Sequence, residues 1–312
     1  MKRFIVTAFT LLFTLAGMAQ VDSMQLMMDQ MAAEEAKSAE PDYVRATFKT
    51  TRVINFPSCE TIGKKMLDFR INHRFGELNT GVKNAFGLDG PAGIRLGLDY
   101  GVTDWMTVGI GRSSFEKLID GAVKVRVLRQ TVDGKMPVSV TYQGTMNYTV
   151  QDDPNRNATG VDKYQYATSR MSYANSLTIS RKFSENFSIQ INAFHVHYNL
   201  VERASDQNDM FAAGISGRYK LTKRLALTFE YARRLNKYTD SFDSFYDPMG
   251  IGIDLETGGH VFQLHFTNSY GINEAQFVPY TRANLFDGGI RFGFNISRVF
   301  ATGQRGHGGS TW

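Results

Sequence analysis

A strict alternation of apolar and polar residues constrains the fold of this chain more than any other feature. In the stretch MPVSVTYQGTMNYTV, Val138, Val140 and Tyr142 lie on one face, and Ser139 and Thr141 lie on the other. Successive side chains of a β-strand point to opposite sides, so a period of two over more than a dozen residues predicts a strand.

The same period returns along the chain after Pro41 and predicts an all-β fold of about twelve strands. Pro279 weakens the prediction of the eleventh strand, because proline cannot donate to the ladder. A further short strand over RVINF, around Ile54, stays open as an alternative. The twelve strands are expected at residues 64–75, 92–101, 105–113, 118–130, 136–150, 168–182, 187–200, 209–221, 224–236, 257–268, 273–281 and 288–300.

Short and long connections alternate along this series of strands. An outer-membrane barrel has short periplasmic turns at one end and longer extracellular loops at the other. The pattern therefore predicts an antiparallel up-and-down transmembrane β-barrel, with both ends of the barrel domain on the periplasmic side. Tight turns are expected at 102–104, 184–186 and 222–223, and long loops at 76–91, 151–167, 201–208 and 237–256.

A membrane barrel differs from a secreted β-sandwich or a lipocalin-like binder in what its apolar face contacts: lipid in the first, the protein core in the others. Around Ser172, Ser176 and Thr178 the polar face is small and uncharged, whereas soluble surfaces carry more Lys and Glu. About ten residues per strand match a tilted membrane crossing. Aromatic residues near strand ends suit the membrane interfaces. They are Tyr100, Trp105, Phe183, Phe187, Tyr219, Tyr231 and Phe300. The apolar face is therefore expected to meet lipid.

Composition agrees with this interpretation and excludes other classes. Hydrophobic residues make up 42% of the chain, too few for a protein with many apolar helices of about 20 residues. The net charge is +5, or about +3 without Lys2 and Arg3, which is too mild to indicate nucleic-acid binding. Cys59 is the single cysteine, so we expect a small buried side chain and no disulfide framework.

The first residues have the layout of a secretory signal peptide. Lys2 and Arg3 precede an apolar stretch, and Gly17 and Ala19 form a small-x-small cleavage site. An uncleaved N-terminal anchor is the alternative. The predicted organisation is a signal peptide at residues 1–19, an amphipathic or flexible periplasmic segment at 20–42, a β-barrel domain at 43–300 and a flexible tail at 301–312.

Residues 20–42 carry methionines at helical spacing, which predicts a short amphipathic helix ended by Pro41. The four methionines are Met24, Met27, Met28 and Met31. We expect this segment to be mobile, or to dock on a periplasmic partner or on the barrel mouth.

Four stretches resemble an uncharacterised outer-membrane β-barrel family of Bacteroidota. They are TRVINFPSCETIGKKMLDFRINHRFG (51–76), GLDYGVTDWMTVGIGRS (97–113), GGHVFQLHFTNS (258–269) and GFNISRVF (293–300). The resemblance covers most of the chain after residue 43 and implies a barrel in the outer membrane. That family is a β-barrel domain of unknown function, so the resemblance implies no catalytic residue.

Charged residues with inward parity define the candidate site. In this set basic residues outnumber acidic ones. A lumen that plugs itself with salt bridges is one interpretation, because buried charges need partners. A pore that favours anionic solutes is the other. The set includes Arg70, Arg74, Arg95, Asp99, Asp120, Lys124, Arg126, Arg218, Glu230, Arg234 and Arg291.

His195 and His197 lie two residues apart and share a face. The apolar parity changes along this strand, and a β-bulge near Ala193 would reconcile the two halves. With the bulge, both histidines point inward. Two histidines alone fall short of the four ligands of a structural metal site. We therefore expect hydrogen-bonded lumenal histidines and no metal.

The stretch DDPNRNATG resembles a calcium loop through Asp153, Asn155 and Asn157. Ala158 stands where that loop requires Gly, and Tyr164 stands where it requires the closing Glu. The stretch is therefore interpreted as an Asx-rich loop tip.

Three function hypotheses remain. The first is a small-solute channel with a net-basic lumen, the second a structural or partner-binding component with a plugged lumen, and the third a barrel-embedded hydrolase. No local signature joins a nucleophile to a base, and no haem, phosphate-loop or dinucleotide motif occurs, so no enzyme and no cofactor are expected. Expected partners are outer-membrane lipid, the barrel-assembly machinery, which the final strand ending at Phe300 suits, and a periplasmic partner of residues 20–42.

Overall fold

The computed structural model describes residues 27, 28, 30, 41–155, 161–203, 205–236 and 245–302. The chain divides into two units, residues 1–42 and 43–312. In the first unit, Met27, Met28 and Gln30 are helical and exposed. The rest of the helix predicted for residues 20–42 and the predicted signal peptide lie outside the described residues.

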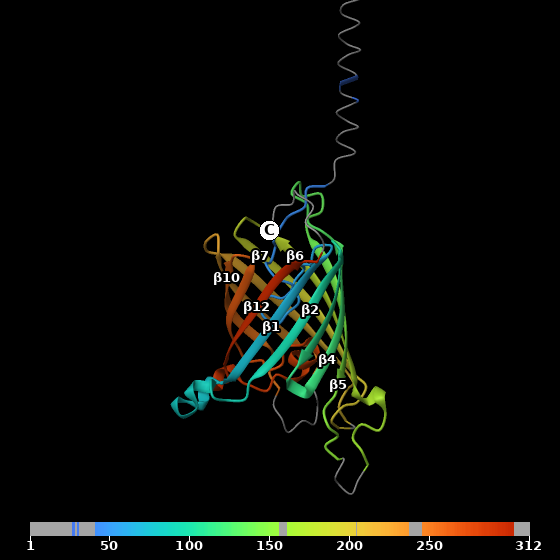
Figure 1. Ribbon diagram of the computed structural model, residues 1–312, viewed down its shortest axis with the longest axis vertical. Coiled ribbons are helices and arrows are strands. Elements are labelled where there is room, and N and C mark those ends of the chain that lie inside the picture. The colour runs from blue at the N-terminus through green and yellow to red at the C-terminus, as the bar shows by residue number, and fades with distance from the viewer. Residues whose placement is uncertain are drawn as a thin grey trace, which may run out of the picture. The chain divides into compact units, whose positions relative to one another are not determined.

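The second unit is a closed barrel of twelve antiparallel strands in which every strand pairs with its neighbours along the chain and β1 pairs with β12 (Figure 1). The predicted all-β, up-and-down barrel of about twelve strands is confirmed. The strands are β1 (Met66–Glu77), β2 (Gly93–Thr103), β3 (Met106–Ser113), β4 (Leu118–Leu128), β5 (Ser139–Thr149), β6 (Met171–Lys182), β7 (Phe187–Tyr198), β8 (Asp209–Lys220), β9 (Leu225–Arg234), β10 (Met249–Thr257), β11 (His260–Thr267) and β12 (Arg291–Ala301).

One predicted strand is wrong, and one strand of the barrel is absent from the prediction. Residues 273–281 do not form a strand, because Glu274–Tyr280 form the helix α2, which Asn273 caps by accepting the N–H of Ala275. The missing strand is β10, which lies in the predicted loop 237–256 except for its last residue, Thr257, and pairs with β11 across a turn at Gly258 and Gly259. The short 3₁₀ turns are η1 (Leu78–Thr80), η2 (Val82–Gly87), η3 (Phe115–Lys117), η4 (Ala167–Arg170) and η5 (Leu285–Asp287).

The outer face of the barrel is apolar along the strands, and the inner face is polar. Ile110 and Ile251 are 58% and 62% exposed on the outside, whereas Asn72 and Asn147, which point inward, are fully buried. This arrangement inverts that of a soluble barrel and matches strands that face lipid. In the described part of the chain, no helix combines the length and the apolar character that crossing a bilayer requires.

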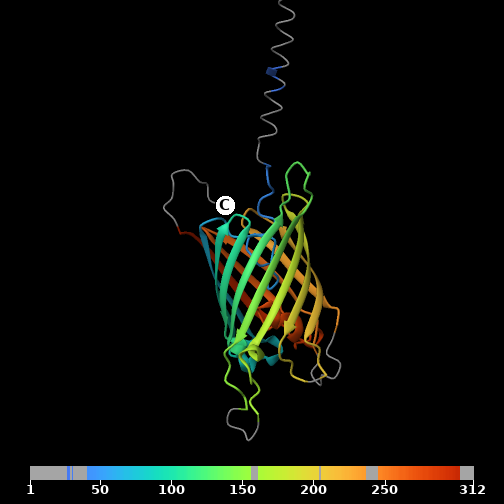
Figure 2. The same cartoon turned by 90° about the vertical axis from the view of Figure 1, so that its right-hand side faces the viewer.

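The two ends of the barrel differ in the length of their connections (Figure 2). One end carries tight turns between β2 and β3, β6 and β7, β8 and β9, and β10 and β11, with Trp105 and Phe183 exposed beside them. We call it the turn end. The other end carries the long connections after β1, β5, β7, β9 and β11, and we call it the loop end. The connection from β3 to β4 at the loop end is short, and that from β4 to β5 at the turn end is longer than predicted.

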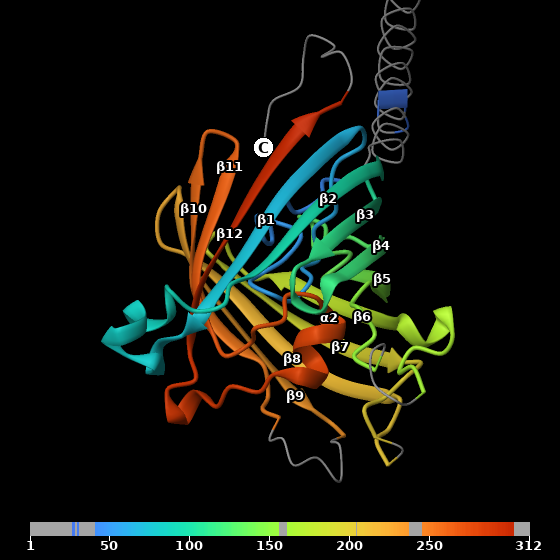
Figure 3. The ribbon, with the colours of Figure 1, turned by 60° about the horizontal axis from the view of Figure 1, so that its bottom comes forward.

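The lumen of the barrel contains two inserted parts of the chain (Figure 3). Residues 47–62, here named the plug segment, precede β1 and are buried at nearly every position. The helix α2 folds inward from the connection between β11 and β12, and it contacts β6, β7, β8 and β9. The interior is therefore packed by the chain itself.

Candidate functional site: the filled lumen

The inner wall carries the charged residues that sequence parity placed in the lumen. They alternate along the strands with the apolar residues of the outer face, which fixes their inward direction. Asp99, Arg126 and Arg291 are partly buried. The others are at least nine-tenths buried, namely Arg70, Arg74, Arg95, Asp120, Lys124, Arg218, Glu230 and Arg234.

Acidic or carbonyl partners surround the basic members of this set. Arg95 Nη2 lies 2.6 Å from Asp120 Oδ1, and Arg70 Nη2 lies 2.8 Å from Asp68 Oδ2. Such pairs offset the large desolvation penalty of a buried charge. Further pairs are Arg126–Glu60, Arg218–Glu256 and Arg291–Glu77, and Arg234 donates to the carbonyls of Phe245 and Pro279.

The tip of the plug segment is a tight hairpin. The N–H of Val53 donates to the carbonyl of Phe56 at 2.9 Å, and the N–H of Ser58 donates to the carbonyl of Thr51 at 2.9 Å. The extra strand considered over RVINF is therefore not a barrel strand. A buried hairpin that belongs to no sheet needs other partners for its backbone groups, because an unpaired buried N–H or C=O is unfavourable.

Glu230 of β9 supplies most of the acceptors for this tip. Its carboxylate accepts the backbone N–H groups of Ile54, Asn55 and Phe56 at 2.9–3.1 Å, and the side-chain amide of Asn55 at 2.7 Å. Glu230 is 2% exposed, so these four donors stand in for the water that a carboxylate would otherwise bind. One wall residue therefore holds three successive residues of the tip.

Lys124 of β4 holds both arms of the hairpin. Its Nζ donates to the carbonyls of Thr51 at 2.8 Å and Ser58 at 3.1 Å, one on each arm. Amides and hydroxyls of other strands satisfy further plug carbonyls. The donors are Gln263 to Val53, Asn295 to Ile54, Gln190 and Asn192 to Pro57, and Thr141 to Cys59. Strands around the whole barrel thus contact the plug segment.

The plug segment and α2 meet inside the barrel. Glu274 Oε1 lies 2.9 Å from Arg52 Nη1 and also accepts the side-chain amide of Gln143 of β5 at 3.0 Å. The ring of Phe277 stacks on that of Phe56, with centroids 5.3 Å apart. An ion pair and an aromatic stack therefore join the two inserted parts.

An apolar cluster surrounds these stacked rings at the loop end of the lumen. Phe194 and Val196 of β7 point inward and are at most 2% exposed. Phe194 contacts the rings of both Phe56 and Phe277 edge-on. The cluster also contains Ala174, Met210, Ala212, Ala232, Ala275 and Val278. It explains the change of apolar parity along β7, because the inner face itself becomes apolar here.

The predicted bulge near Ala193 is therefore wrong, and so is the inward direction of the two histidines. β7 pairs with β6 and β8 in unbroken register. His195 and His197 point outward, where His195 Nε2 and His197 Nδ1 lie 2.8 and 2.9 Å from the same Oδ1 of Asp209. Asn175 lies 3.2 Å from His195 Nδ1. Within the described ranges, no three His, Cys, Asp or Glu side chains are grouped as metal ligands.

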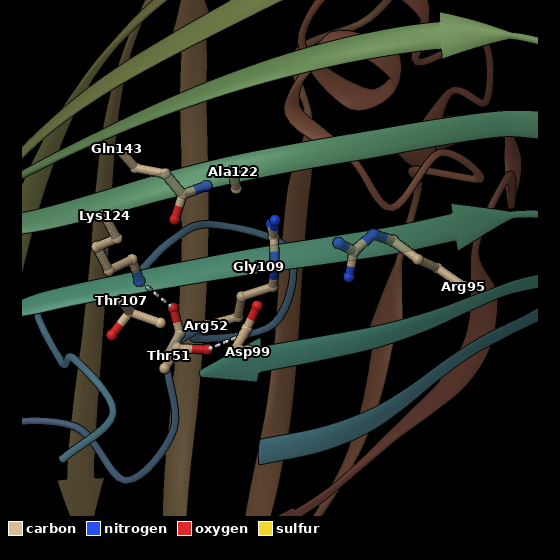
Figure 4. A pocket seen from close by; sticks show the side chains of 9 residues that line it. All are labelled: Thr51, Arg52, Arg95, Asp99, Thr107, Gly109, Ala122, Lys124 and Gln143. Atoms are coloured by element: carbon tan, nitrogen blue, oxygen red, sulfur yellow. Dashed lines mark hydrogen bonds between the residues drawn. The ribbon is translucent and has the colours of Figure 1, made fainter. Parts of the chain in front are cut away.

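A small polar cavity remains between the plug segment and the wall formed by β2 to β5 (Figure 4). It has room for about one or two water molecules. At its edge Lys124 donates to the carbonyl of Thr51, and the hydroxyl of Thr51 donates to Asp99 at 3.3 Å. The other lining residues are Arg52, Arg95, Thr107, Gly109, Ala122 and Gln143. The cavity is too small for a metabolite.

The calcium-like stretch forms part of the connection between β5 and β6. Asp153 accepts the backbone N–H groups of Asn155, Lys163 and Tyr164 at 2.7–3.1 Å. Partial burial of the carboxyl opposes the shift, but these three N–H donors outweigh it and lower the pKa of Asp153. The carboxylate is thus used to order the loop, as an Asx-rich tip requires. Residues 156–160 lie outside the described residues.

Sequence parity missed the residues that fill the lumen. Arg52, Asn55 and Phe56 lie in a segment without alternation, and Glu274 and Phe277 lie in a stretch that was interpreted as a strand. Cys59 is buried, as predicted. The available signal was indirect: the stretch RVINFPSCE mixes polar and apolar residues without sustained alternation and precedes the first strand.

Comparison with known proteins identifies one family. Residues 48–300 match the model of a family described as a membrane bound beta barrel domain (DUF5777). No curated protein matches the chain.

Among solved structures, the NanC porin is 9% identical with a TM-score of 0.43, and the alignment covers 75% of this chain and 98% of that one. An outer membrane channel from Pseudomonas putida F1 is 11% identical, with a TM-score of 0.43 and coverage of 78% and 98%. The outer membrane phospholipase A from Escherichia coli is 9% identical, with a TM-score of 0.40 and coverage of 75% and 91%.

Proposed function

This chain belongs to the DUF5777 family of membrane-bound β-barrel domains, and we propose that it acts as a closed, non-enzymatic barrel of the outer membrane. In this proposal the barrel anchors the protein and presents its N-terminal segment and long loops to partners, while small solutes do not pass. An origin in Bacteroidota and a signal peptide at residues 1–19 remain predictions from the sequence.

One observation carries this proposal: the link between the two inserted parts. Arg52 and Glu274, each less than one-tenth exposed, form an ion pair, and Glu230 accepts four N–H donors from the plug tip. A standing pore for anions needs both an open path and cations free to attract solute. The paired charges of the described lumen support the closed alternative.

Conductance in planar lipid bilayers tests the proposal. Wild-type protein, verified as folded by its heat-dependent mobility in detergent gels, is expected to give no steady current. If that protein gives steady currents as large as those of barrels with an open pore, the proposal of a closed barrel is wrong.

A gated channel is the second candidate, and the chemistry of the plug contacts favours it. The wall holds the plug segment largely by side-chain bonds to its backbone, and the twelve strands close on themselves without it. Displacing the segment would leave a polar inner wall that carries Arg70, Arg95 and Arg218. The double variant Arg52→Ala, Glu230→Ala separates the candidates, because a gated channel would then conduct with anion preference, and a purely structural barrel would still not conduct.

The partner role has its own test. Deleting residues 20–42 behind an intact signal sequence is expected to abolish co-purification of a periplasmic partner and to leave the folded barrel in the membrane. A partner that is retained at the same yield would argue against this segment as the binding site.

The hydrolase hypothesis is not proposed. In the described part of the chain, no Ser, Thr or Cys side chain is found hydrogen-bonded to a histidine, whereas an activated nucleophile needs a base within reach.

A further inference from the structure

We infer that the connection between β1 and β2 is a lateral foot that rests in the lipid–water interface at the loop end. The foot comprises residues 78–90, which include η1 and η2. It projects sideways from the barrel wall in two views related by a rotation about the horizontal axis (Figures 1 and 3). By contrast, the described parts of the connection between β5 and β6, residues 150–155 and 161–166, extend away from the barrel along its axis (Figures 1 and 2).

The foot carries three large apolar side chains that are more than half exposed. Val82 is 79% exposed, and Phe86 and Leu88 are 53% and 52% exposed. On the neighbouring connection between β11 and β12, Phe286 is 93% exposed. Grouped apolar side chains of this size on a fixed surface mark a contact with lipid or protein rather than with water.

The foot is held in a fixed position. Gly87 packs so closely on the end of β1 that a Cβ there would lie 2.6 Å from the carbonyl oxygen of Gly76, and Gly90 packs on the same residue. Asn79 donates to the carbonyl of Asp287 at 3.4 Å, and the N–H of Leu78 donates to the carbonyl of Ile290 at 2.8 Å. These contacts tie the foot to the end of β1 and to the connection that leads into β12.

The backbone of η2 is strained at two successive residues. Ala85 and Phe86 have φ values of 46° and 52°, a left-handed conformation that bulky residues rarely adopt. Such strain persists only where surrounding contacts impose it and is concentrated at functional positions. Phe86, one of the two strained residues, is also one of the exposed apolar residues of the foot.

The foot directly follows a group of aromatic residues on the lipid-facing outside of the barrel. We therefore assign lipid, and not a protein, as what the foot contacts. Phe75 on β1 lies three residues before the foot, and its ring stacks on that of Phe292, which in turn contacts Phe266 of β11. Aromatic rings at strand ends mark the membrane interface. A sideways projection directly beyond this belt would lie along the bilayer surface, with Val82 and Phe86 in the boundary between headgroups and acyl chains.

Site-directed fluorescence measures this contact directly. Phe86→Cys is labelled with an environment-sensitive thiol probe in protein reconstituted into phosphatidylcholine vesicles, and Val82→Cys serves as a second position in case the first fails to fold. Tyr166→Cys is the matched control, because Tyr166 is 70% exposed in the connection that points along the axis. Unmodified protein controls for Cys59, which is only 2% exposed.

We expect the probe at residue 86 to be quenched by vesicle lipid carrying a nitroxide near the headgroup and to be shielded from aqueous iodide. The probe at residue 166 is expected to show the reverse. Equal iodide quenching at both positions, without lipid quenching at residue 86 or 82, would overturn the inference. Shielding from iodide without lipid quenching would also overturn it and would indicate a protein contact instead.

Discussion

Glu274 of α2 lies 2.9 Å from the guanidinium of Arg52 in the plug segment, although 222 residues separate the two in the chain. Both side chains are buried, at 1% and 8% exposure. The pair joins an insertion that enters before the first strand to another that enters before the last. The buried charge of Arg52 in the plug segment is therefore neutralised by α2, and that of Glu274 in α2 by the plug segment.

Breaking this pair should destabilise the filled barrel. Glu274→Gln removes the negative charge and leaves Arg52 buried without its counter-ion, which costs about 3 kcal/mol or more in such sites. Urea unfolding in detergent micelles measures the loss. Lys117→Gln is the matched control, since its pair with Asp152 is exposed and should contribute little. Equal losses in the two variants would contradict the role assigned to the buried pair.

Releasing the plug tip should expose Cys59. Glu230→Gln replaces two acceptor oxygens by one and so leaves donors of Ile54, Asn55 or Phe56 unsatisfied. A loss of about 1.4 kcal/mol in plug closure corresponds to a roughly tenfold faster reaction of Cys59 with a thiol reagent such as dithionitrobenzoate.

Wild-type Cys59 should react very slowly. Burial, reinforced by the neighbouring Glu60 carboxylate, raises the pKa of its thiol to about 12, so the thiolate is scarce at neutral pH. Glu202→Gln, which changes only an exposed loop pair with Lys163, is the control and should react as slowly as wild type. If Glu230→Gln is no faster than this control, Glu230 does not hold the tip.

Two strand glycines should differ sharply in their tolerance of alanine. A Cβ at Gly101 would lie 2.0 Å from the carbonyl oxygen of Gly63, where the chain leaves the plug segment for β1. At Gly121 a Cβ would meet nothing within 4 Å. Gly101→Ala should therefore destabilise the barrel by about 2 kcal/mol, because overpacking forces backbone shifts. The temperature at which the folded band disappears from detergent gels measures both variants, and similar values would refute the close packing.

Asp133, in the connection between β4 and β5, should titrate far below an ordinary aspartate. The hydroxyl of Thr131 and the N–H of Lys135 donate to its carboxylate and lower its pKa to about 2. Because the folded pKa lies below the unfolded value of about 3.9, the bonds stabilise the turn above pH 4 and are lost as the pH falls towards 2.

Carboxyl carbon NMR shifts of Asp133 measure this directly. Thr131→Val removes the largest cause and should move the midpoint up towards the unfolded value. A wild-type midpoint near 4 would show that these donors do not hold the carboxylate.

The strands with clear alternation could be predicted from the sequence alone. Val138 to Val150 predicts β5 because each second residue meets lipid, and lipid requires apolar side chains at every such position. The sequence does not predict β10, because Gly250 and Gly252 stand at two of its inward positions, where the other strands carry polar side chains. Glycines at this spacing are more typical of a loop. α2 was misassigned because seven residues, with Pro279 among them, are too few to establish a helical period.

The contents of the lumen could not be predicted in this way. Alternation reports which residues face lipid, but it does not report what the opposite face meets. From the sequence, Phe194 and Val196 are expected to face lipid. Residues that pack in an apolar cluster inside the barrel are apolar too, so the sequence pattern does not distinguish the two environments. The contacts of Glu230 with Ile54 and Asn55 join residues about 175 positions apart, which no local pattern records.

The plug segment has a topological consequence. Both of its arms return to the turn end: Val44 donates to the carbonyl of Gln130 beside one turn, and Lys64 donates to Asp104 in another. A hairpin with both arms at one opening is inserted and not threaded. The plug segment can therefore leave the lumen through the turn end without breaking the pairing of any two strands. The pairing between β1 and β12 can stay intact throughout.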